Sequence, residues 1–111
     1  MSHITTYTTW VKFKAEEVKL LIEAMKGLGE IKAANDLQNI TLRPHVGTII
    51  RFSLVNGAYV PRTDTYGYEK QMTETMNTIQ QRYKAAILGD ILRTKGFTAA
   101  VNGTVITARR Y

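Results

Sequence analysis

The sequence contains no cysteine, only two prolines and one tryptophan among its 111 residues. Without cysteine, neither a disulfide scaffold nor a thiolate zinc site is available. No apolar run approaches the roughly 18 residues that a transmembrane helix needs. Hydrophobic residues make up 44% and charged residues 22% of the chain, as in ordinary globular proteins. We therefore expect one soluble domain over residues 1–111, cytoplasmic and without a membrane partner.

Side chains for metal binding and nucleophilic catalysis are also scarce. His3 and His45 are the only two histidines, and the chain has neither a Gly-x-Ser-x-Gly motif nor a glycine-rich phosphate loop. Glu16 and Glu17 are more simply explained by the first turn of a helix, where the helix dipole favours acidic residues, than by a catalytic pair. The expectation is a protein with no metal, no cofactor and no enzymatic activity.

The first part of the chain predicts a strand followed by a helix. Residues 4–14 alternate with period two and are rich in threonine and aromatic residues, which is typical of a strand. Residues 15–28 carry apolar side chains at the 3.6-residue period of an amphipathic helix. Residues 30–36 fit neither pattern clearly.

The middle of the chain predicts strands. Residues 37–42 fit a short strand, and residues 48–55 form the most apolar run of the chain, typical of a central strand. The pair Asn56-Gly57 follows that run and indicates a hairpin turn, because both turn residues need positive φ. Residues 61–68, from Pro61 to Tyr68, are expected to form a loop, since proline lacks the N–H that a strand ladder uses.

A long helix and a second hairpin are predicted for the remainder. From Glu69 onward an apolar stripe stays on one helix face, which predicts a buried face packed against a sheet containing Ile49, Phe52 and Leu54. Asp90 falls on that face if the helix is straight, so a kink or a restart of the helix near Gly89-Asp90 is expected. Asn102-Gly103 indicates the turn of a second hairpin. The stripe consists of Met72, Met76, Ile79, Tyr83, Ile87 and Ile91, and the first five of these are predicted to be buried.

The predicted element order is β-α-β-β-β-α-β-β. This order matches neither strict strand–helix alternation nor an all-β chain. It predicts an α+β fold with two helices packed on one face of an antiparallel or mixed sheet. A ferredoxin-like arrangement decorated by hairpins is the simplest architecture of this kind.

Net charge is the remaining functional signal. Fifteen Lys and Arg residues against nine Asp and Glu residues give a formal charge of +6. Arg82 and Arg93 are eleven residues apart, which is about three helical turns, so they should lie on one side of the long helix. With Arg110 on the last strand and Tyr66 and Tyr68 available to stack on bases, they form a candidate site for nucleic acid, a nucleotide or another phosphate-bearing ligand.

The same residues also fit roles in folding or in protein contacts. The basic flank is typical of a solvated helix surface, and the two loop tyrosines fit core packing as well as recognition. Arg82 has a structural alternative, pairing with Asp90 or with a loop carbonyl. An adaptor or inhibitor that meets a protein target through a strand edge or hydrophobic patch is the alternative function. Spare apolar residues on the long helix, Leu88 and Leu92, also predict a homo-oligomer.

Short motifs at both ends resemble a known family. These are residues 1–6 (MSHITT) opening into a strand, residues 81–83 (QRY) inside the long helix, and residues 95–97 (KGF) followed by Asn102-Gly103 and a strand ending in residues 109–111 (RRY). They resemble the family of hypothetical chloroplast open reading frame 35, domain of unknown function 1257. The middle departs from it, because residues 62–68 replace an aromatic, acidic stretch. The resemblance implies a cyanobacterial, plastid or phage protein acting in a host cytoplasm or stroma, and it carries over no biochemical role.

Overall fold

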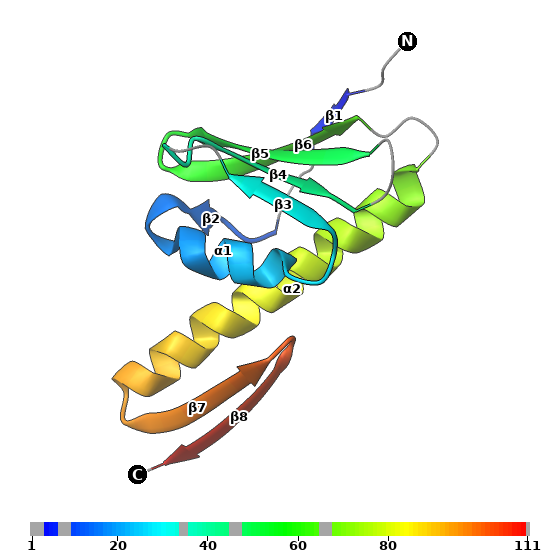
Figure 1. Ribbon diagram of the computed structural model, residues 1–111. Coiled ribbons are helices and arrows are strands. Elements are labelled where there is room, and N and C mark those ends of the chain that lie inside the picture. Colours follow the sequence, from blue (N-terminus) through cyan, green and yellow to red (C-terminus); the bar gives the residue numbers. More distant parts are fainter. Residues whose placement is uncertain (1–3, 7–9, 34–35, 45–47, 65–67, 111) are drawn as a thin grey trace.

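The computed structural model of the chain describes residues 4–6, 10–33, 36–44, 48–64 and 68–110. It is an α+β fold, as predicted, with extents of 56 × 27 × 22 Å (Figure 1). The elements are β1 (Ile4–Thr6), β2 (Phe13–Lys14), the 3-10 helix η1 (Ala15–Glu17), α1 (Val18–Met25), β3 (Glu30–Ala33), β4 (Asn39–Arg43), β5 (Ile49–Val55), β6 (Ala58–Asp64), α2 (Glu69–Thr94), β7 (Phe97–Asn102) and β8 (Val105–Arg110).

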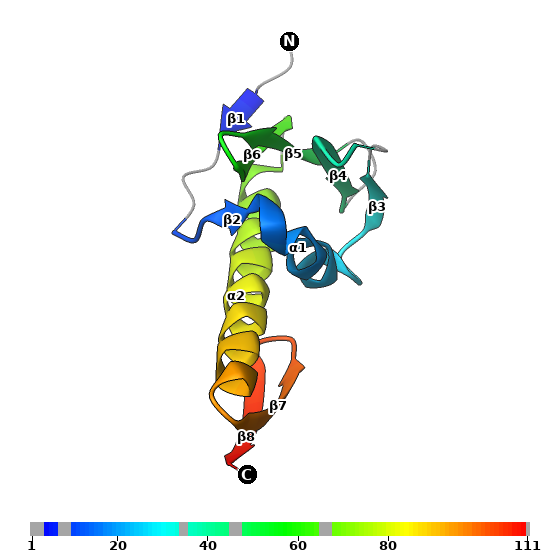
Figure 2. The ribbon, with the colours of Figure 1, turned by 90° about the vertical axis from the view of Figure 1, so that its left-hand side faces the viewer.

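Two separate antiparallel sheets make up the strand content. The larger sheet has the order β1-β6-β5-β4-β3, with β2 also pairing with β6, and both helices lie on the same side of it (Figures 1 and 2). Strands β7 and β8 pair only with each other and pack on the far half of α2. Because the last hairpin stays out of the main sheet, the ferredoxin-like order is not confirmed.

Several predicted boundaries differ from the observed ones. The predicted strand over residues 4–14 is two short strands, and the helix over residues 15–28 begins as η1 and ends at Met25. The segment over residues 30–36 contains β3. These differences concern only where the elements begin, end or divide. The spacing of apolar residues still matches the type of element, strand or helix, that each predicted segment forms.

The loop predicted from Pro61 is wrong in its first half, because β6 continues to Asp64. On its outer side β6 pairs with β2 at Ala58 and Tyr59, and with β1 from Arg62 onward. Pro61 therefore lies between two ladders on that side, at a position where a missing N–H is tolerated.

Both predicted hairpins form, but the second turn lies one residue further along. Asn56 and Gly57 connect β5 and β6 with φ of 51° and 79°. Asn102 is still paired in the ladder of β7 and β8, so the second turn consists of Gly103 and Thr104, with φ of 63° at Gly103. The Asn-Gly pair located both hairpins, and only its glycine is a turn residue in the second.

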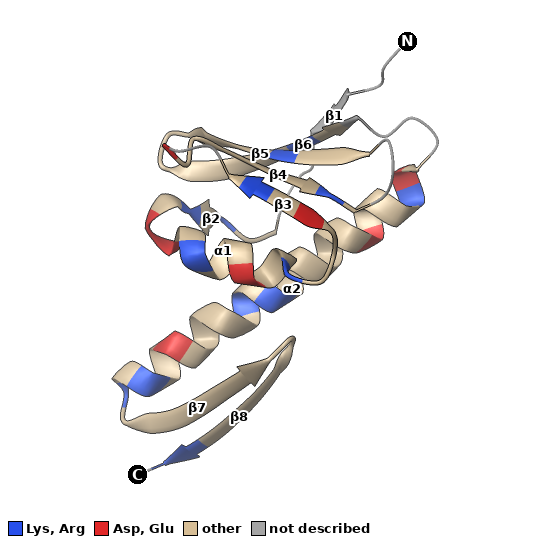
Figure 3. Ribbon diagram, viewed as in Figure 1, with Lys and Arg blue, Asp and Glu red and all other residues tan. Residues whose placement is uncertain are grey.

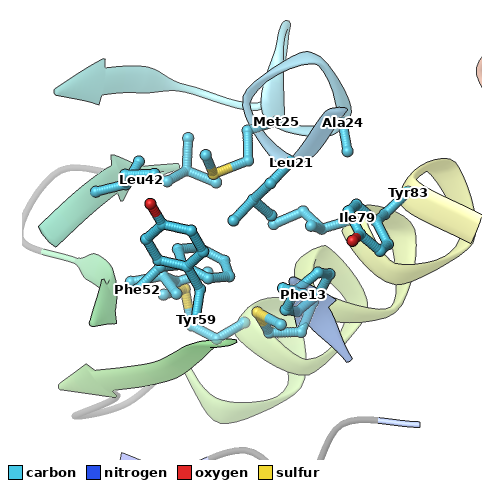
Figure 4. Close-up of a cluster of buried hydrophobic side chains, with 13 residues drawn as sticks. Phe13, Leu21, Ala24, Met25, Leu42, Phe52, Tyr59, Ile79 and Tyr83 are labelled. Atoms are coloured by element: carbon cyan, nitrogen blue, oxygen red, sulfur yellow. The ribbon is translucent and has the colours of Figure 1, made fainter. Parts of the chain in front are cut away.

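The core lies between the helices and the inner face of the main sheet (Figure 4). Phe13 meets Phe52 and Tyr83 edge-to-face, with ring centroids 5.8 Å and 5.0 Å apart. Such geometry places the positive ring edge against the negative ring face. The core cluster consists of Phe13, Leu21, Ala24, Met25, Ile40, Leu42, Ile50, Phe52, Tyr59, Met72, Met76, Ile79 and Tyr83.

The sheet residues predicted to meet the long helix need correction. Phe52 is fully buried, but Ile50 and not Ile49 shares its face, because side chains alternate along a strand. Leu54 has the inward parity of Phe52, yet it is 37% exposed near the hairpin end of β5.

Helix α2 runs without interruption through Gly89 and is straight in Figure 1, so the predicted kink or restart is absent. A Cβ atom at Gly89 would lie 2.5 Å from Cγ2 of Val101, so glycine allows the close approach of β7. Ile87 is half-buried where full burial is predicted, and Ile91, the last residue of the stripe, is 44% exposed. Asp90 is therefore not placed in the core, although it falls on the face of the apolar stripe. The main core ends near Tyr83, and beyond this residue α2 packs on the hairpin of β7 and β8.

Two hydrogen bonds join the N-terminal segment to α2. The main-chain N–H of Lys14 donates to the hydroxyl oxygen of Tyr83 at 3.1 Å, and that of Trp10 donates to Oε1 of Gln80 at 2.8 Å. Burial raises the pKa of Tyr83 above 10.0, and the acidic side chains of η1 add to this, while the bond from Lys14 opposes it. The folded state therefore favours the neutral phenol.

Candidate functional site

Arg82 is bonded to the end of α1. Its Nη1 donates to the carbonyls of Ala24 at 3.5 Å and Lys26 at 3.0 Å. The last carbonyls of a helix lack partners within the helix, and a cation is favoured there by the helix dipole. The contact matches the loop-carbonyl alternative for Arg82, and Asp90 is paired elsewhere.

Arg93 joins α2 to the C-terminal hairpin. Its Nε donates to the carbonyl of Ala99 at 3.0 Å, and its Nη1 lies 2.7 Å from Oδ1 of Asp90. The Nε–H of the guanidinium thus binds the hairpin, and Nη1 forms an ion pair with Asp90, which lies one turn earlier on the helix. These contacts give Arg93 a structural role.

The eleven-residue spacing does bring Arg82 and Arg93 to one pocket. The pocket has a volume of about 400 Å³ and lies between α1, α2 and the tip of the hairpin. Glu23 and Asp90 line it as well, so the two formal positive charges face two negative ones. Since the charges balance, the pocket has no excess positive charge to hold a phosphate.

The other predicted residues do not join this pocket. The guanidinium of Arg110 lies 5.8 Å from the ring centre of Phe97, within the hairpin. Tyr68 is 41% exposed at the start of α2, about 37 Å along the helix axis from Arg93. Tyr66 lies outside the described residues. The five candidates therefore do not form one site in the part of the chain that the structure describes.

A second cationic surface lies on the open face of the main sheet. In β4 and β5 the inward residues are buried, and Thr41 and Arg51 point to the face without helices. Lys32 pairs with Thr41, Thr41 with Arg51, and Arg51 with Arg62, so these residues form one line across β3, β4, β5 and β6. We call Lys32, Arg51 and Arg62 the basic row.

The basic row has few anionic neighbours (Figure 3). Lys32 pairs with Glu30 at 3.5 Å, and both side chains are largely exposed. Arg51 and Arg62 are exposed, and neither makes an ion pair or hydrogen bond with any side chain that the structure describes. Directly opposed side chains of an antiparallel pair have Cβ atoms about 4.5–5.5 Å apart. Two directly opposed guanidinium groups therefore have no anionic partner among the side chains that the structure describes.

Comparison of the chain with family models, curated proteins and solved structures gives no match. The resemblance to the chloroplast open reading frame 35 family stays a prediction. No helix of the described residues is long and apolar enough to cross a membrane. Among the described side chains, no group of three or more His, Cys, Asp or Glu residues could hold a metal ion.

Sequence reasoning missed the basic row, although a signal for it was present. Arg51 interrupts the most apolar run of the chain, and Arg62 is as far after the turn Asn56-Gly57 as Arg51 is before it. A two-residue turn sets the register of a hairpin, so equal distances from the turn predict a cross-strand pair. This pairing was missed because Arg62 belongs to the loop predicted from Pro61.

Proposed function

We propose that the protein is a small, non-enzymatic binding protein that engages the phosphate backbone of single-stranded nucleic acid through the basic row. The observation that carries this proposal is the pair Arg51 and Arg62, directly opposed and without an anionic partner among the described side chains. Like charges in this position destabilise a sheet. A phosphate between them turns that repulsion into two attractive contacts.

The chemistry of the row suits phosphate. Arginine presents a planar fork that pairs two oxygens at once, and it keeps its charge at all physiological pH values. A permanently protonated group binds anions but does not act as a general base, which favours binding over catalysis. Lys32 adds a third cation, and its exposed pair with Glu30 is of the weak, exchangeable kind.

The dimensions favour a polymer. Strands lie about 4.8 Å apart, so the row from β3 to β6 spans about 14 Å, more than one phosphate group needs. An extended chain of phosphates can contact all three cations, whereas a mononucleotide cannot. No described helix or hairpin projects from this face to enter a groove of a duplex (Figures 1 and 2). An open sheet suits an unpaired strand better.

The test compares two double variants that remove the same charge. Arg51→Gln with Arg62→Gln removes both arginines of the row and leaves Lys32. Arg82→Gln with Arg93→Gln is the matched control, and each double variant removes two of the positive charges behind the net +6. Fluorescence anisotropy with a labelled oligo(dT) of about twenty nucleotides measures affinity from low to physiological salt. The row variant should bind at least about tenfold more weakly, with a salt slope shallower by about 1.4, because each phosphate contact on a single strand contributes about 0.7.

The control should keep its affinity but melt at a lower temperature, because it loses the contacts to α1 and β7. If it does not fold, Arg109→Gln with Arg110→Gln removes two exposed charges from β8 instead. Equal losses in the row variant and the folded control would overturn the proposal, since net charge alone would then explain binding. Absence of binding by the wild type at low salt would overturn it too. Displacement of oligo(dT) by thymidine monophosphate at equal phosphate concentration would show that the ligand is a nucleotide.

A further inference from the structure

A stripe on α2 points away from both the Arg82 pocket and the hairpin contact. Lys84, Leu88 and Ile91 of α2 and Lys95, directly after its last residue Thr94, follow one another at spacings of four, three and four residues, which keeps them on one side of the helix. Leu88 is 42% and Ile91 is 44% exposed. We call these four residues the α2 stripe. It has two apolar residues in the centre and a lysine at each end.

Trp10 extends this surface beyond the first lysine. The indole is 54% exposed, and the ammonium of Lys84 lies 5.6 Å from its ring centre. The hydrogen bond from the main-chain N–H of Trp10 to Gln80 fixes the residue beside α2. A lysine over a tryptophan face is held by cation–π attraction and keeps its charge available to a partner.

Charge decides which occupant this surface fits. A second copy packed antiparallel would place Lys84 beside Lys95 of its neighbour, and a parallel copy would place like lysines together. Both arrangements bring cations together at the ends of the apolar centre. The acidic residue nearest in sequence, Asp90, is paired with Arg93 on another side of α2. The stripe therefore complements acidic residues and repels itself.

We propose that the α2 stripe, with Trp10, is a docking site for an amphipathic helix of a partner protein that carries acidic residues at both ends of its apolar stripe. A straight helix of 26 residues offers a ridge for a second helix, and packed helices lie about 8–10 Å apart. Lys84 and Lys95 are about 16 Å apart along the axis. The partner helix should therefore have acidic residues about eleven positions apart, with apolar residues between them.

Synthetic helical peptides test this charge pattern directly. One peptide carries two leucines at the spacing of Leu88 and Ile91, with a glutamate at the position matching each lysine; the other has lysines in place of the glutamates. Fluorescence anisotropy with labelled peptide should show binding of the acidic peptide and at least about tenfold weaker binding of the basic one. The double variant Leu88→Ser with Ile91→Ser should bind the acidic peptide at least about tenfold more weakly than the wild type. Lys84→Glu with Lys95→Glu should reverse the preference between the two peptides.

Val105→Ser is the matched apolar control, because Val105 is 62% exposed on the hairpin, away from the stripe. It should leave peptide binding unchanged. All substituted positions are exposed or at the surface, and circular dichroism verifies folding of each variant. Failure of the wild type to bind the acidic peptide at about 100 μM, or equal binding of both peptides, overturns the proposal. Light scattering that shows a dimer dissolved by Leu88→Ser with Ile91→Ser also overturns it, since the occupant is then a second copy. None of these outcomes depends on the basic row.

Discussion

Removing one arginine of the basic row should stabilise the protein. At a charge separation of about 6 Å, Coulomb's law gives a repulsion of about 0.7 kcal/mol in water. Cross-strand pairs in sheets contribute about 0.2–1 kcal/mol, so the two figures agree. Arg62→Gln, which keeps the length of the side chain, should therefore raise the free energy of unfolding by about 0.5 kcal/mol at low salt.

A double-mutant cycle isolates this repulsion from other effects of the substitution. Arg51→Gln alone should give a similar gain, and the double variant no more than either single one, because the repulsion can be removed only once. Urea denaturation of the four proteins measures the coupling at about 10 mM salt and again at 1 M. At 1 M the screening length is about 3 Å, so the coupling should disappear. Additive gains, or a coupling unchanged by salt, would refute the reasoning. A row that costs stability and is required for binding is what a ligand site predicts.

Three further predictions concern the core, the hairpin and the tyrosines. Ile79→Ala should lower the free energy of unfolding by about 2–5 kcal/mol by opening a cavity, and a loss below about 0.5 kcal/mol in urea denaturation would contradict its burial. Gly89→Ala should destabilise the protein although alanine favours helix by about 1 kcal/mol, because its Cβ would press on Val101; adding Val101→Ala should restore stability, and a single variant as stable as the wild type would disprove the contact. Burial raises the pKa of Tyr59 and Tyr83 above 10.0, so their contribution to stability is present below pH 10 and is lost as the pH rises through the folded pKa values. Phenolate absorbance should show late titration of Tyr59 and Tyr83, and changing either residue to phenylalanine should remove one late-titrating group.

Local periodicity was enough to predict most elements of this fold. The apolar positions Met72, Met76, Ile79 and Tyr83 are buried where the 3.6-residue period puts them, since a helix that covers a sheet must present one apolar stripe. The spacing of apolar residues does not indicate at which residue the helix stops covering the sheet. Ile91 continues the stripe in sequence, but the main core ends near Tyr83. The separate sheet of β7 and β8 likewise depends on packing between distant segments, for which one sequence carries no local signal.

The candidate site shows the same division between local and distant information. Helical spacing correctly placed Arg82 and Arg93 on one side, but their partners come from α1 and β7, segments far away in the chain. Lys32 lies in the segment whose structure the pattern left open. Only the pairing of Arg51 with Arg62 could be predicted from the sequence, because both residues are equally far from the hairpin turn.

The position of the unpaired cations is more informative than the net charge of +6. Lys26 and Arg93 have acidic partners, and the pocket that holds Arg82 is electrically balanced. These cations contribute to the net charge yet are occupied by the fold itself. Arg51 and Arg62 have no partner among the described side chains, so an incoming phosphate displaces no described ion pair at either residue. Under the proposed function, a polyanion contacts this adjacent pair of arginines on the open face of the sheet, and this is where the matched charge variants should differ.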